Sequence, residues 1–120
     1  MGQAMNPAVL QAKLWYAQRI SAMVLGICVA IHLGIIFYAI RGGLTAQEIL
    51  GRTQGNLAFA IFYELFVIAC FVHAPIGIAN ILQETFPSSG IAKPIASVLG
   101  LLILILGSAA VFGVYSAGSL

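Results

Sequence analysis

The sequence predicts an all-α membrane protein in which three transmembrane helices form a bundle. Of its 120 residues, 62% are hydrophobic, and only three are acidic and five basic. This balance excludes a soluble core with a polar shell. The apolar residues gather in three runs, 20–40, 57–82 and 95–115. Each has the roughly 20 residues that an α-helix needs to cross a bilayer, whereas β-barrel strands are short and alternating.

The first transmembrane helix is expected at residues 14–41. Trp15 and Arg19 lie near its start, where an aromatic ring and a snorkelling cation anchor a helix at the membrane surface. Gly42 and Gly43 follow its end and permit a chain reversal. The run is a full span without a small-residue cleavage site behind it, so we expect it to be retained rather than removed as a signal peptide.

A short surface helix is expected in the first loop. Thr45 and Glu48 have the spacing of a capping box, and Gly51 is expected to close the segment. A turn at Gly55 then leads into the second transmembrane helix, expected at residues 57–83.

The third transmembrane helix is expected at residues 94–116, after a loop rich in proline, serine and glycine. This span has no histidine and no charged residue. We therefore expect it to act as scaffold.

The charges of the short loops favour a cytoplasmic N-terminus, because cations concentrate on the cytoplasmic side of membrane proteins. Three cations fall on the N-terminal side and two on the other: Lys13, Arg19 and Lys93 against Arg41 and Arg52. No Arg-rich organellar transit segment is seen, so a bacterial inner membrane is the simplest location. The chain has no basic face for nucleic acid, and the lipid bilayer is the first expected partner.

Two histidines, His32 and His73, lie deep in apolar runs, where ionisable groups are costly and usually functional. At a rise of 1.5 Å per residue, His32 lies roughly 13 Å and His73 roughly 25 Å from the same membrane side. One haem iron needs both axial nitrogens on one line, so two haems are expected if each histidine binds one. Each haem would take its second ligand from another subunit. Gly77, one turn from His73, would let a flat porphyrin approach. The alternative is hydrogen bonding between helices.

Glu64 is the third unusual residue, at a depth close to that of His32. It is expected to accept the N–H of that imidazole, to relay protons at a quinone site, or to be protonated and bonded to backbone. Gln18, Arg19 and Ser21 form a polar cluster near the start of the first helix. They suit a quinone carbonyl or a haem propionate, and the alternatives are headgroup contact and helix packing.

Over almost all of its length, the chain resembles the membrane-anchor cytochrome b subunits of the succinate dehydrogenase and fumarate reductase family. Two segments carry the resemblance, Arg19 to His32 and Glu64 to Glu84. The pattern of the single-haem branch is matched by Arg19, Ser21, His73, Gly77 and Ile78. Ala79 and Asn80 replace its arginine and second histidine. His32 and His73 are similar to the first pair of ligands in the two-haem branch.

The resemblance implies a haem b-binding membrane anchor that passes electrons between an iron–sulfur subunit and quinone. The chain would not be catalytic alone, and its other partners would be a flavoprotein subunit and a second small anchor subunit. The complex would oxidise succinate or reduce fumarate. One alternative is a haem-free structural anchor of the same kind of complex. Another is an unrelated small transport or assembly protein, which the scarcity of polar residues in the third span disfavours.

Overall fold

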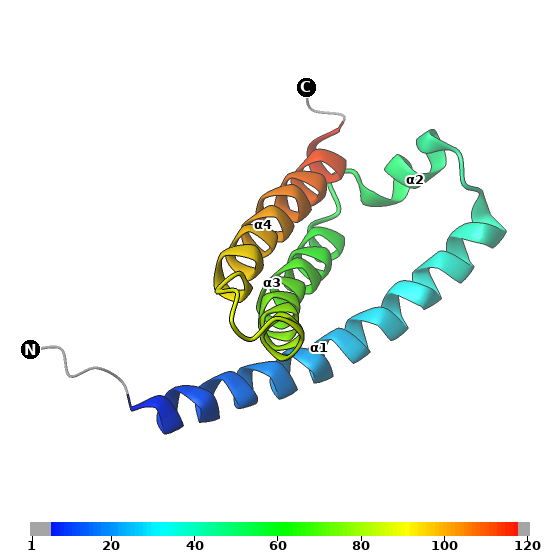
Figure 1. The fold of residues 1–120 in the computed structure, drawn as a ribbon. Helices are drawn as coiled ribbons and strands as arrows, with labels where there is room; N and C mark the ends of the chain where they lie inside the picture. Colours follow the sequence, from blue (N-terminus) through cyan, green and yellow to red (C-terminus); the bar gives the residue numbers. More distant parts are fainter. Residues whose placement is uncertain (1–5, 118–120) are drawn as a thin grey trace, which may run out of the picture.

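The computed structural model describes residues 6–117, and all regular structure within them is helical. Four helices follow one another, α1 (Pro7–Gly42), α2 (Ala46–Thr53), α3 (Leu57–Thr85) and α4 (Ala92–Ser116) (Figure 1). Three of them, α1, α3 and α4, are long and apolar enough to cross a membrane. The predicted all-α class and the three predicted spans are therefore confirmed.

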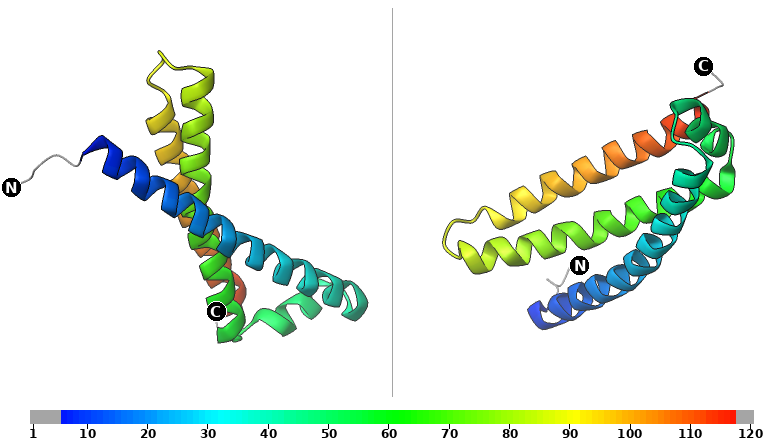
Figure 2. Two further views of the ribbon diagram at one scale, coloured as in Figure 1. Left: turned by 90° about the horizontal axis from the view of Figure 1, so that it is seen from below. Right: turned by 90° about the vertical axis from the view of Figure 1, so that its right-hand side faces the viewer.

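The central helix of the bundle is α3, which packs against both α4 and α1. It lies alongside α4, whereas α1 crosses it at an angle and diverges from both helices toward its C-terminal end (Figures 1 and 2). The short α2 bridges the gap at this end. A hydrogen bond of 2.9 Å from the Gly55 amide to the Tyr115 carbonyl ties the start of α3 to the end of α4.

The first helix begins at Pro7, earlier than residue 14, where it was predicted to begin. The side chain of Asn6 caps it by accepting a hydrogen bond of 2.9 Å from the Ala8 amide, and Pro7 suits the first helical position. The prediction followed the apolar run and overlooked this cap. The helix ends at Gly42, as expected within one residue, and Gly43 follows with a φ of 112°.

The predicted capping box at the start of α2 is confirmed. Thr45 Oγ1 accepts from the Glu48 amide at 3.2 Å, and Glu48 Oε2 accepts from the Thr45 amide at 3.0 Å. The Thr45 hydroxyl also donates a hydrogen bond of 2.8 Å to Glu48 Oε2. This bond first, and then the bond from the Thr45 amide, hold the pKa of the Glu48 carboxyl below its ordinary value. Gly51 does not end the helix as expected, because α2 continues to Thr53. Arg52 in its last turn donates a hydrogen bond of 3.1 Å to the Gly43 carbonyl.

Small residues bring α3 and α4 close together. A Cβ atom added at Gly107 would lie 2.7 Å from Cγ1 of Val67, and one added at Gly100 would lie 2.9 Å from Cγ of Pro75. Close backbone approach over glycine is a common way for membrane helices to associate. The α3–α4 pair is therefore packed as a unit, and α3 runs without a break through Pro75 to Thr85.

The outer surface is apolar on nearly every side. Large side chains remain more than half exposed on each long helix, among them Ile27 (64%), Phe37 (69%), Ile61 (61%) and Phe112 (67%). Such a surface suits lipid chains or other membrane helices rather than water. The chain is a multi-pass membrane protein.

Candidate functional site

His73 meets α1 at a buried serine. Ser21 is only 5% exposed, and its Oγ lies 3.3 Å from Nδ1 of His73. The same hydroxyl donates a hydrogen bond of 3.0 Å to the Gln18 carbonyl. A hydroxyl has a single proton, so when the Gln18 carbonyl takes it, Nδ1 of His73 is the donor to Ser21 Oγ. The lone pair of His73 is then on Nε2, where a metal can bind it.

Gln18 lies beside this pair and against Gly77. A Cβ atom at residue 77 would be 3.3 Å from Nε2 of Gln18, so the glycine makes room for the amide. From the sequence, we expect a porphyrin to approach the helix at this glycine; in the structure the Gln18 amide lies there. Within the described part of the chain, the buried Oε1 of Gln18 has no hydrogen-bond partner. A buried acceptor without a donor is costly, so this atom is a candidate contact for a bound group or a neighbouring subunit.

His32 forms a second pair with α3. Its Nδ1 lies 2.8 Å from the hydroxyl oxygen of Tyr63, and its ring makes an edge contact with Phe66 at a centroid distance of 5.7 Å. When Nδ1 donates to Tyr63, the lone pair is again on Nε2. Both histidines thus use the same ring nitrogen within the chain and keep the other for a ligand.

An apolar cavity of about 430 Å³ opens beside the His32–Tyr63 pair. It lies where α1 diverges from the other helices, and residues of all four helices line it. Apart from the pair and Thr53, every lining residue is apolar, as Ile35 and Val111 illustrate. The apolar lining of this pocket suits a flat apolar group.

The two histidine pairs lie at separate levels of the α1–α3 contact. Ser21 and His32 are eleven residues apart on α1, a rise of about 16 Å. Tyr63 and His73 are ten residues apart on α3, a rise of about 15 Å. The two pairs are therefore about 15 Å apart along α3, against the roughly 12 Å difference in depth expected from the sequence.

Two other candidate residues, Glu64 and Arg19, have partners outside the two histidine pairs. The structure pairs Glu64 with α4, where its Oε1 accepts a hydrogen bond of 2.7 Å from Ser108, in place of the expected contact with His32. Successive residues on a helix are rotated by about 100° about its axis, so Tyr63 faces α1 while Glu64, the next residue, faces α4. The exposed guanidinium of Arg19 lies 4.9 Å from the Trp15 ring centre.

Sequence reasoning missed Tyr63 and Ser108. The signal for Tyr63 was its depth, because a phenol inside a membrane usually finds a hydrogen-bond partner, and His32 lies at a similar depth. Ser108 shows that α4 supplies a polar contact as well as scaffold.

Comparison with known proteins adds one finding. The model of the family described as "Succinate dehydrogenase/Fumarate reductase transmembrane subunit" matches residues 3–115. No curated protein and no solved structure matches the chain.

Proposed function

The chain belongs to the family of transmembrane subunits of succinate dehydrogenase and fumarate reductase, and from this premise we propose that it is a haem b-binding membrane anchor. In this proposal it passes electrons between the iron–sulfur subunit of the complex and quinone. One observation carries it: His32 and His73 each engage Nδ1 within the chain, which leaves Nε2 for iron. Histidine ligands of metals usually donate their other ring N–H in this way.

The residues around each histidine fit this role. Haem supplies one-electron redox chemistry when it is bound. Ser21 and Tyr63 fix the orientation of the two imidazole rings. The apolar walls of the cavity beside His32 exclude water, and low polarity around a metal site adjusts its potential.

The proposal requires a second small anchor subunit. The sequence has two histidines, and they lie at different levels, so a second histidine ligand for each haem would come from outside the chain. The exposed apolar faces of α1, α3 and α4 give such a subunit a surface to cover. The soluble flavoprotein and iron–sulfur subunits then dock at the end where α1 begins. The loop charges favour a cytoplasmic position for this end, and a bacterial inner membrane is the location we propose.

We place the quinone head beside Gln18, with Ser21 behind it and Arg19 at the rim. The unpartnered Oε1 of Gln18 is an acceptor, so it suits the hydroxyl of the reduced quinol. Arg19 is exposed and able to donate to a quinone carbonyl. Glu64, held by Ser108, is a candidate proton relay.

A reduced-minus-oxidised spectrum of the purified complex tests the proposal, with haem counted per copy of this chain. We expect a haem b signal of one or two haems per copy. We also expect deletion of the chain to abolish quinone reduction while succinate oxidation with a soluble electron acceptor continues. A complex that contains the chain, reduces quinone and has no haem b would identify a purely structural anchor and overturn the proposal.

Removing the hydrogen-bond partner of one histidine should weaken the binding of one haem only. Tyr63→Phe deletes the hydroxyl that meets His32, and Ser21→Ala deletes the one that meets His73. Loss of such a partner typically lowers metal affinity about 10- to 100-fold. Haem retention on dilution in detergent measures the effect. Tyr16→Phe is the control, because Tyr16 is 61% exposed, and equal retention in Tyr63→Phe and Tyr16→Phe would contradict the assigned role.

A further inference from the structure

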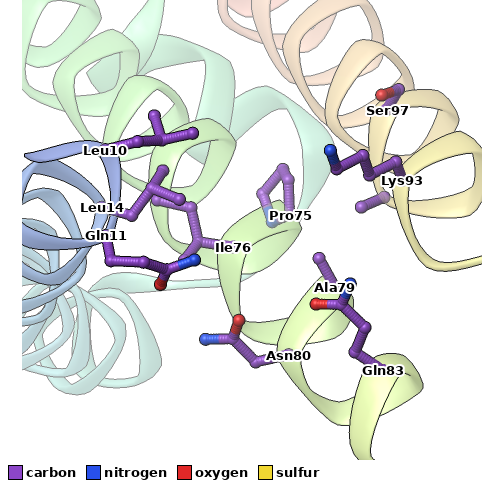
Figure 3. Close-up of a pocket in the computed structure, with 11 residues that line it drawn as sticks. Leu10, Gln11, Leu14, Pro75, Ile76, Ala79, Asn80, Gln83, Lys93 and Ser97 are labelled. Atoms are coloured by element: carbon purple, nitrogen blue, oxygen red, sulfur yellow. The ribbon is translucent and has the colours of Figure 1, made fainter. Parts of the chain in front are cut away.

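A second cavity, of about 410 Å³, lies at the end of the bundle where α1 and α4 begin and α3 ends. Its floor is apolar, with Leu10 and Leu14 from α1 and Ile76 and Ala79 from α3. Polar side chains from all three helices border the same space (Figure 3). They are Gln11, Asn80, Gln83, Lys93 and Ser97. The cavity beside His32 has almost no polar surface by comparison.

The polar groups around this cavity have no side-chain partners in the described part of the chain. Among residues 6–117, none of the five makes a side-chain hydrogen bond or an ion pair, whereas Ser21, His32, Glu64 and His73 are all paired. Lys93 is the one charged residue in the lining, and no lining residue is acidic. The cavity therefore presents a positive charge and several amide groups to whatever enters it.

The lining selects an amphipathic molecule with an anionic head. Lys93 lies in the first turn of α4, where the helix dipole adds to its positive potential. An ammonium at this position pairs with a phosphate as a charge-assisted hydrogen bond. A quinone head is uncharged and would leave Lys93 without a counter-ion. Gln18, Arg19 and Ser21, where we place the quinone, do not line this cavity.

We infer that this cavity binds a phospholipid, with its phosphate on Lys93 and its headgroup bonded by Gln11, Asn80 and Gln83. The first acyl-chain carbons lie on the apolar floor formed by Leu10 and Ile76. The lipid fills the wedge between α1 and the α3–α4 pair. The net charge of the lining favours an anionic lipid such as phosphatidylglycerol over zwitterionic phosphatidylcholine. This inference is independent of haem binding.

Native mass spectrometry of the delipidated complex, titrated with phosphatidylglycerol or phosphatidylcholine, tests the inference. We expect the wild-type complex to retain phosphatidylglycerol in preference. Lys93→Gln should lower its affinity about tenfold, since it removes one charge-assisted hydrogen bond. Lys13→Gln is the matched control, because Lys13 is exposed on α1 and does not line the cavity. Its affinity should equal that of the wild type.

Ala79→Leu provides a second variant, which keeps the charge and fills the apolar floor, and it too should lower phosphatidylglycerol retention. Equal lipid affinity in all four proteins would overturn the inference. So would a Lys93→Gln complex that keeps its lipid and loses bound quinone, which would make the cavity a quinone site. Loss of the soluble subunits with lipid binding unchanged would instead assign Lys93 to protein docking and refute the lipid site. Haem is counted in the same samples, so failure of the haem proposal is recognised separately.

Discussion

We expect His73→Ala to remove one haem b from the purified complex and His32→Ala to remove a different one. The physical reason is distance, because the contacts of the two histidines with the neighbouring helix lie about 15 Å apart along α3. A single iron, with its two axial ligands on one line, does not reach both. Haem content per complex, together with the redox potential of the haem that remains, identifies which centre each variant has lost.

Two outcomes of this experiment would contradict the assignment. Loss of the same single haem in both variants would refute the assignment to two levels. Full haem content in both would show that neither histidine is a ligand and that Ser21 and Tyr63 serve helix packing alone. Cys70→Ala is a suitable control, since Cys70 lies one turn from His73 on α3, is partly buried, and is a free thiol. It should retain the full haem content.

The second large effect concerns the α3–α4 contact. Gly107→Ala places a Cβ atom 2.7 Å from Cγ1 of Val67, which forces the two helices apart. Overpacking of this kind costs about 1–3 kcal/mol. In a helix, alanine is otherwise favoured over glycine by about 0.8–1.0 kcal/mol. Helix propensity alone would thus make Gly107→Ala stabilising, whereas we expect the clash to make it destabilising. The midpoint of unfolding in denaturing detergent measures the change in stability.

Gly113→Ala is the matched control for this prediction. It lies on the same helix, and no atom lies within 4 Å of its added Cβ, so we expect it to be neutral or slightly stabilising. Val67→Ala should rescue Gly107→Ala, because it removes the methyl groups that clash. Equal unfolding midpoints for Gly107→Ala and Gly113→Ala would contradict the described packing.

The spans and the surface helix could be predicted because local rules determine them. Backbone groups in lipid must be satisfied within a helix, so length and hydropathy locate α3 to within two residues of its end at Thr85. The capping box is likewise a matter of spacing, and it correctly located the start of α2. The depth of each histidine follows from the helical rise alone.

The hydrogen-bond partners could not be predicted in the same way. They depend on how each helix is rotated about its axis, and a helix that is apolar on all sides carries no pattern that fixes this rotation. Glu64 was therefore expected near His32, whereas it faces Ser108, and Tyr63 takes its place. The cavity around Lys93 was missed for a related reason, because its polar residues come together only when three helix ends meet.

The contact between α1 and α3 has a mechanical consequence. Ser21, Cys28 and His32 are spaced seven and four residues apart, so they form one stripe along α1, and Cys28 in the middle is only 2% exposed. A rotation of α1 about its axis would move the hydroxyl that holds His73 and the ring of His32 together. A subunit that turned α1 would therefore shift the contacts of both histidines at once, because Ser21 and His32 belong to the same helix.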